Sequence, residues 1–92
     1  MERPVSRREL AAAIIHILTV KGVADPEDAV QVLGSPVDSN QLFAVIPSDR
    51  AQVPLEDVLI RVTGHRHPTA GDLWILDEAQ SLALIEIAKK LS

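Results

Sequence analysis

Residues 77–91, DEAQSLALIEIAKKL, constrain the fold of this chain more than any other segment. Asp77 and Gln80 have the spacing of a capping box, and Lys89 and Lys90 close the last turn, where the helix dipole favours positive charge. On a helical wheel, apolar side chains cover about 200°, which is more than one neighbouring surface usually buries. We therefore expect a long helix that packs on its own domain along one edge and on a partner along the other.

This C-terminal helix is the predicted surface for self-association, with a homodimer as the expected product. The candidate interface residues are Leu84, Ile85, Ile87, Ala88 and Leu91. The alternative is a helix enclosed by the core of the monomer, which would leave little of its apolar surface for a partner.

The composition predicts one soluble domain spanning residues 1–92. Apolar residues make up 47% of the chain, which is typical of a globular protein. The chain has no cysteine, so it has no disulfide and no thiol nucleophile, in agreement with a cytoplasmic location. The longest uninterrupted apolar run, residues 10–15, is too short to cross a membrane, and no signal peptide is expected.

The net charge is −4, and the acidic residues concentrate in the middle of the chain, at residues 23–57. Basic residues concentrate at residues 1–22 and 58–71. A strongly basic surface of the kind that dominates nucleic-acid binding is absent from this pattern.

The first half of the chain contains residues typical of helix starts and helix ends. Ser6 and Glu9 have capping-box spacing, and Gly22 is expected to end the helix that follows. Its apolar stripe consists of Leu10, Ala13, Ile14, Ile17 and Leu18. A second helix is expected over residues 25–34, because Asp25 is a good cap and Pro26 suits the first helical position.

Residues 41–46 are compatible with a helix or with a buried strand. We favour a helix capped by Asp38 or Ser39, and Pro47 ends either element.

Residues 57–64 and 72–76 are predicted to be strands, joined by the turn-rich stretch GHRHPTAG into a hairpin with a long tip. The alternative for the first strand is a helix with Pro54 at its first position. Trp74, the only tryptophan, is expected to be buried where its strand meets the C-terminal helix. The whole pattern predicts a helix-rich α+β fold with a β-hairpin and a long C-terminal helix.

No combination of residues indicates catalysis. His65 and His67 alternate along an extended segment, but zinc needs three or four protein ligands, so no metal is expected. The acidic segment LDEAQ follows an apolar run as in P-loop ATPases, but no phosphate-binding loop accompanies it. No nucleophile elbow is present either. We therefore predict a protein that is not an enzyme and has no cofactor.

Two short segments, LGSPVDSNQLF and HPTAGDL, resemble acyl and peptidyl carrier proteins. The resemblance implies a phosphopantetheine group on Ser39, in the turn that follows Asp38. Asn40 stands where these carriers usually have leucine, and Pro47 interrupts the helix that should follow the serine. We keep carrier function as an alternative.

The expected order of elements is helix, helix, helix, strand, strand, helix. This order resembles that of the winged-helix transcription regulators, and the resemblance is carried by IIHILTVKGVADPEDAVQVLG and LWILDEAQSLALIEIAKKL. It implies a recognition helix that reads the major groove, a wing tip near the DNA backbone and arginines on phosphates. The corresponding DNA-binding candidates are Arg7, Arg8, Ser39, Asn40, Gln41, Arg50, His65, Arg66 and His67.

The alternative to DNA binding is a protein-interaction or adaptor module without nucleic-acid binding. The position of the arginines distinguishes these hypotheses. Arg7, Arg8 and Arg66 on one face would favour DNA, whereas their location on opposite faces would favour an adaptor.

Overall fold

The computed structural model describes residues 5–35, 40–47, 51–68 and 70–91. The fold is α+β, as predicted, with a β-hairpin and a C-terminal helix. Along the chain the elements are α1 (Arg7–Val20), the 3-10 turn η1 (Pro26–Asp28), β1 (Gln31–Gly34), β2 (Leu42–Val45), α2 (Val53–Thr63), β3 (Leu73–Leu76) and α3 (Glu78–Lys90).

Helix α1 forms where its capping residues and Gly22 predict it. The Ser6 hydroxyl accepts a hydrogen bond from the backbone N–H of Glu9 at 3.0 Å, which satisfies one of the free donors of the first turn. The helix gives way at Lys21 to Gly22, whose positive φ of 84° suits a residue without a Cβ. The predicted apolar stripe is buried in full: Leu10, Ala13, Ile14, Ile17 and Leu18.

The predicted helix over residues 25–34 is wrong. Only η1 is helical, and Asp25 adopts a left-handed φ of 50° without a side-chain cap. The chain then extends into β1, which pairs with β2. Val30 and Val32 lie on either side of Gln31 and pack against the core, and β-branched side chains suit a pleated strand. Sheet pairing has outweighed the local capping signals in this short segment.

The predicted helix at residues 41–46 is also wrong, and the strand alternative is right. Leu42, Ala44 and Ile46 are buried while their neighbours are half-buried, so the segment follows the two-residue period of a strand. The caps proposed for this helix, Asp38 and Ser39, lie outside the described residues.

The predicted strand at residues 57–64 is wrong as well, since α2 occupies this segment and Pro54 lies in its first turn. Leu55, Val58 and Leu59 are buried at helical spacing, and Gly64 ends the helix with a φ of 76°. The stretch GHRHPTAG therefore joins a helix to a strand and is not a hairpin tip. The hairpin of this fold is formed by β1 and β2.

The end of the chain agrees with prediction. Asp77 Oδ1 accepts from the N–H of Gln80 at 2.7 Å, and Gln80 Oε1 accepts from the N–H of Asp77 at 3.0 Å. This is a complete capping box at the start of α3. Trp74 on β3 is buried, with 3% of its surface exposed.

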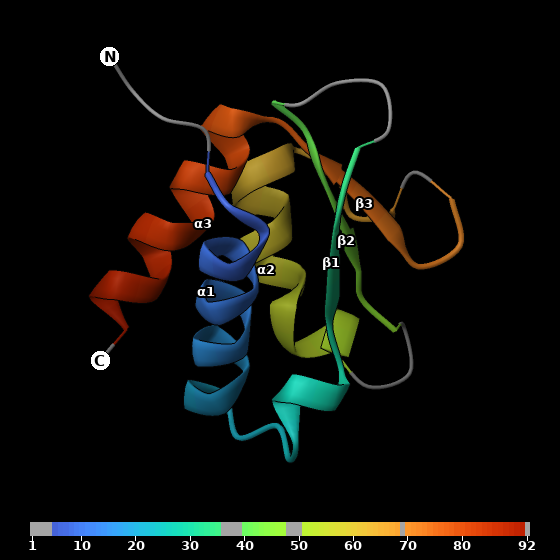
Figure 1. Ribbon diagram of the computed structural model, residues 1–92. Helices are drawn as coiled ribbons and strands as arrows, with labels where there is room; N and C mark the ends of the chain where they lie inside the picture. The colour runs from blue at the N-terminus through green and yellow to red at the C-terminus, as the bar shows by residue number, and fades with distance from the viewer. Residues whose placement is uncertain (1–4, 36–39, 48–50, 69, 92) are drawn as a thin grey trace.

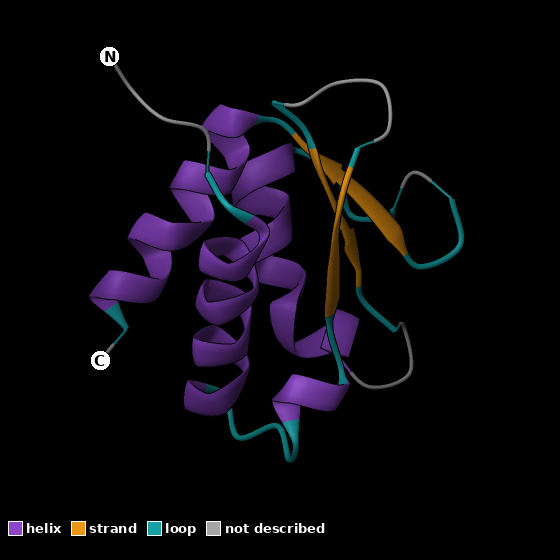
Figure 2. Ribbon diagram, in the orientation of Figure 1, coloured by secondary structure: helices purple, strands orange, loops and turns teal. Residues whose placement is uncertain are grey.

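The sheet is antiparallel in the order β1-β2-β3. Figures 1 and 2 show α1, α2 and α3 together on one side of this sheet. The core lies between the two layers, where helix residues such as Ile17 and Leu84 meet the strand residues Ala44 and Leu76 in one apolar cluster. Within the described part of the chain, no helix has the length and apolar character to cross a bilayer.

The ion pair between α1 and α2 predicts a small pH-dependent contribution to stability. Burial raises the pKa of Asp57, but the hydrogen bond and charge of Lys21, whose Nζ lies 3.2 Å from Asp57 Oδ1, outweigh it, and the pKa ends below its ordinary value of 3.8. A lowered folded pKa stabilises the protein above that ordinary value, and the stabilisation is lost as the pH falls through the folded pKa.

Since both groups are partly exposed, we expect Lys21→Ala to lower the free energy of unfolding at neutral pH by less than about 1 kcal/mol. The difference should vanish in urea titrations well below pH 3.8. In an Asp57→Asn background, Lys21→Ala should have no further effect at any pH. If Lys21→Ala lowers the free energy of unfolding by the same amount in strong acid, the ion pair with Asp57 is not the source of the stabilisation.

Candidate functional site

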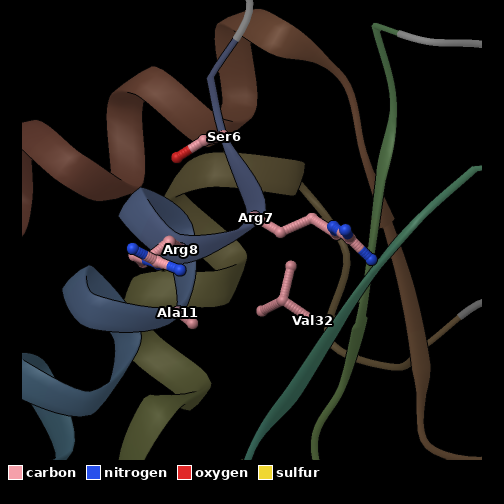
Figure 3. A pocket seen from close by; sticks show the side chains of 5 residues that line it. All are labelled: Ser6, Arg7, Arg8, Ala11 and Val32. Atoms are coloured by element: carbon pink, nitrogen blue, oxygen red, sulfur yellow. The ribbon is translucent and has the colours of Figure 1, made fainter.

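A hollow of about 610 Å³ separates the start of α1 from β1 and contains two arginines. It is lined by Ser6, Arg7, Arg8, Ala11 and Val32. Figure 3 shows the Arg7 side chain extending from α1 toward β1. The Arg8 side chain points away from β1. No ion pair holds either arginine within the described residues. The hollow is therefore a positively charged surface beside an edge of the sheet.

The other predicted cations lie in a different hollow. Arg66 and His67 line it together with Gln52, Val53 and Glu56, and it shares no residue with the first. The Arg66 Nε lies 3.4 Å from Glu56 Oε1, which offsets its charge. Arg66 therefore lines a different hollow from Arg7 and Arg8.

The remaining DNA-binding candidates are not on a helix where the structure describes them. Asn40 and Gln41 precede β2, and the Gln41 carbonyl accepts from the N–H of Ser35 at 3.4 Å. This places them at the end of the sheet where Gly34 approaches Arg7. Ser39, which is also the carrier candidate, and Arg50 lie outside the described residues.

The helix α3 contributes to the core more than predicted. Leu84 is fully buried and Ala88 is 6% exposed, so both belong to the core of this chain and are not open to a partner. Ile85, Ile87 and Leu91 are half-buried. Beside them, a groove of about 500 Å³ runs between α1 and α3, lined by Glu9, Ala12, Ala13, His16, Ile85, Ala88 and Lys89.

The surface that sequence analysis missed is the side of the sheet turned away from the helices, which we call the open face. The strand registers place on it Gln31, Leu33, Phe43, Val45, Leu73 and Ile75. All of these except Gln31 are apolar. Leu33 is 39% exposed, and the four residues of β2 and β3 are half-buried.

A signal for the open face was present in the sequence. An antiparallel sheet that meets water on one side alternates apolar and polar residues, whereas strands buried on both sides are apolar throughout. The runs LFAVI and LWIL are of the second kind. These runs therefore predict a sheet with two apolar faces. The described helices cover only one of these faces.

The described residues offer no candidate metal site. Among the described residues, no three histidine, aspartate or glutamate side chains gather into a group that could hold an ion. His65 and His67 are both exposed, and the backbone N–H of His65 donates to Thr63 Oγ1 at 3.0 Å.

Comparison of this chain with protein-family models, with curated proteins and with solved structures finds no match.

Proposed function

We propose that this protein is a non-catalytic protein-interaction domain that binds its partner on the open face of the sheet. The observation that carries the proposal is the apolar character of both faces of β2 and β3. The open-face residues on β2 and β3 are half-buried and Leu33 is exposed, and contiguous apolar surface that water still reaches marks interaction sites. Phe43, the only phenylalanine, lies in the middle strand and is the central side chain of this surface. We also propose a cytoplasmic location, which the lack of cysteine favours.

The charges around the open face favour a partner with basic flanks. Asp72 and Asp77 bracket β3, and Asp28 lies three residues before Gln31, whereas Arg7 lies at the Gly34 end of the sheet. We call these three acids the acidic rim. An acidic rim around an apolar centre matches an amphipathic segment whose apolar side chains are flanked by lysine or arginine. We commit to such a segment, in helical form, as the occupant.

The test is a titration of the protein with a synthetic amphipathic helical peptide of leucine and lysine, followed by backbone amide NMR. We expect shifts confined to β2, β3 and the Leu33 end of β1. A peptide with leucine and glutamate at the same positions should bind at least about tenfold more weakly, because the acidic rim repels it.

A variant with less apolar surface on the open face should bind the peptide more weakly. The double variant Phe43→Ser/Val45→Thr should lower the affinity for the leucine–lysine peptide by roughly tenfold or more, because apolar area is lost. Val53→Thr is the matched control, because Val53 is 75% exposed on α2, away from this surface. Equal binding of a scrambled peptide, or shifts that map to the helices, would sink the proposal.

DNA binding remains the second hypothesis, supported by Arg7 and Arg8 in one hollow and by Asn40 and Gln41 at the same end of the sheet. Against it stand the pairing of Arg66 with Glu56 and the net charge of −4. We expect no change in the anisotropy of a labelled random duplex at micromolar protein and about 50 mM salt. Binding that is lost near 200 mM salt, and lost in Arg7→Ala/Arg8→Ala, would restore DNA as the ligand.

A further inference from the structure

The strand β1 forms an edge of the sheet and has backbone groups available for another strand. It pairs with β2 alone among the described strands. The pair Ser35–Gln41 is hydrogen-bonded, and antiparallel ladders alternate, so Gln31 and Leu33 direct their backbone groups to β2. Val32 and Gly34 therefore direct their N–H and C=O groups outward.

This edge strand is short, but within its four residues it lacks the side chains that protect an edge from pairing. Natural proteins place lysine, proline or a bulge on exposed edges to prevent association. The sequence of β1, QVLG, contains no charge and no proline, and its register with β2 is continuous. Leu33 is 39% exposed on the open face beside it. The outward backbone groups and the exposed leucine make this edge suitable for pairing with another strand.

The charges at the two ends of β1 are complementary to those of a second copy in antiparallel orientation. At the C-terminal end, the Arg7 Cδ lies 3.8 Å from the position of a Cβ built on Gly34. Before the N-terminal end, η1 carries Glu27 and Asp28. No ion pair within the described residues neutralises these groups. Antiparallel pairing of two copies brings unlike ends together twice, whereas parallel pairing brings like ends together.

We propose that two copies of this chain join through β1, antiparallel across a two-fold axis at Leu33, into one continuous sheet. In this register, Val32 of each copy exchanges backbone hydrogen bonds with Gly34 of the other. The two Leu33 side chains meet on the open face at a non-hydrogen-bonded position, where side chains approach most closely. The absence of a side chain on Gly34 leaves room for Arg7 beside the partner's Val32.

The first measurement is the mass of the full chain in solution, by light scattering and sedimentation, from roughly 1 to 100 micromolar. We expect a species of about twice the 10.0 kDa chain at the upper concentrations. A monomer throughout this range overturns the proposal. The mass reports on the edge and the peptide titration on the open face, so each proposal can fail without the other.

Proline substitutions distinguish the two edges of the sheet. Val32→Pro removes an outward N–H and no hydrogen bond of the β1–β2 ladder, and proline is tolerated at such edge positions. We expect a monomer with an unchanged circular dichroism spectrum. Ile75→Pro is the matched control, because Ile75 directs its N–H away from β2 on the opposite edge. A dimer that survives Val32→Pro but is lost in Ile75→Pro overturns the assignment to β1.

A charge exchange supplies a variant that leaves the monomer intact. Arg7→Glu places a negative charge in the first turn of α1, where the helix dipole favours it, so the fold should not suffer. The dimer dissociation constant should rise about tenfold, since a glutamate at position 7 is repelled by the acids of the other copy. Adding Asp28→Arg to this variant should return the dissociation constant to within about threefold of the value for the unsubstituted chain. An unchanged constant in Arg7→Glu contradicts the antiparallel arrangement.

Discussion

Leu84→Ala is expected to lower the free energy of unfolding by roughly 3–5 kcal/mol, a large part of the stability of a domain of this size. Leu84 has no exposed surface and packs in the cluster between the helices and the sheet. Truncation removes its apolar area from the core and leaves a cavity that close packing cannot fill completely. Urea denaturation followed by circular dichroism measures the loss.

The matched control is Leu82→Ala, two residues earlier on α3, where the side chain is 39% exposed. Its cost should stay below about 1 kcal/mol. Nearly equal losses for the two variants would contradict the orientation of α3. Leu84 is therefore a core residue and not the interface residue that the sequence predicted.

Trp74→Ala is expected to cost a similar amount, roughly 3–5 kcal/mol, because it removes the largest side chain of the core. Since Trp74 is the only tryptophan, its fluorescence reports on this site directly. The native protein should emit at shorter wavelength than the protein in denaturant. A native spectrum like that of an exposed indole would show that the side chain is not buried.

Trp74→Phe separates packing from hydrogen bonding. Among the described residues, no partner accepts the buried indole N–H. Removing an unpaired buried donor avoids the penalty of leaving it unsatisfied. We therefore expect Trp74→Phe to cost clearly less than Trp74→Ala. An equal loss would indicate that the indole N–H makes a bond that matters for stability.

The candidate site could be predicted only in part. Arg7 and Arg8 follow from the sequence as neighbouring cations, but their position beside the edge of the sheet depends on β1, which was predicted as a helix. The open face follows from the runs LFAVI and LWIL once both are known to be strands. Because LFAVI was assigned to a helix, its outward residues Phe43 and Val45 were not recognised as a surface.

The sequence by itself determined α1 and α3, whereas the equally clear helix signal at Asp25 and Pro26 did not produce the predicted helix. Helices α1 and α3 begin at side-chain caps whose hydrogen bonds join residues three apart, and each carries three or more turns of apolar spacing. Such interactions form within one segment and need no knowledge of the rest of the chain.

Only the tertiary structure decided the short segments between these helices. Residues 31–34 and 42–45 are too short for local propensity to choose between helix and strand, and they became strands because each satisfies the backbone groups of the other. Residues 53–63 became a helix because Leu55, Val58 and Leu59 then reach the core together. The burial of Leu84 and the open edge of β1 follow from that assembly, since pairing and packing depend on residues distant in the sequence.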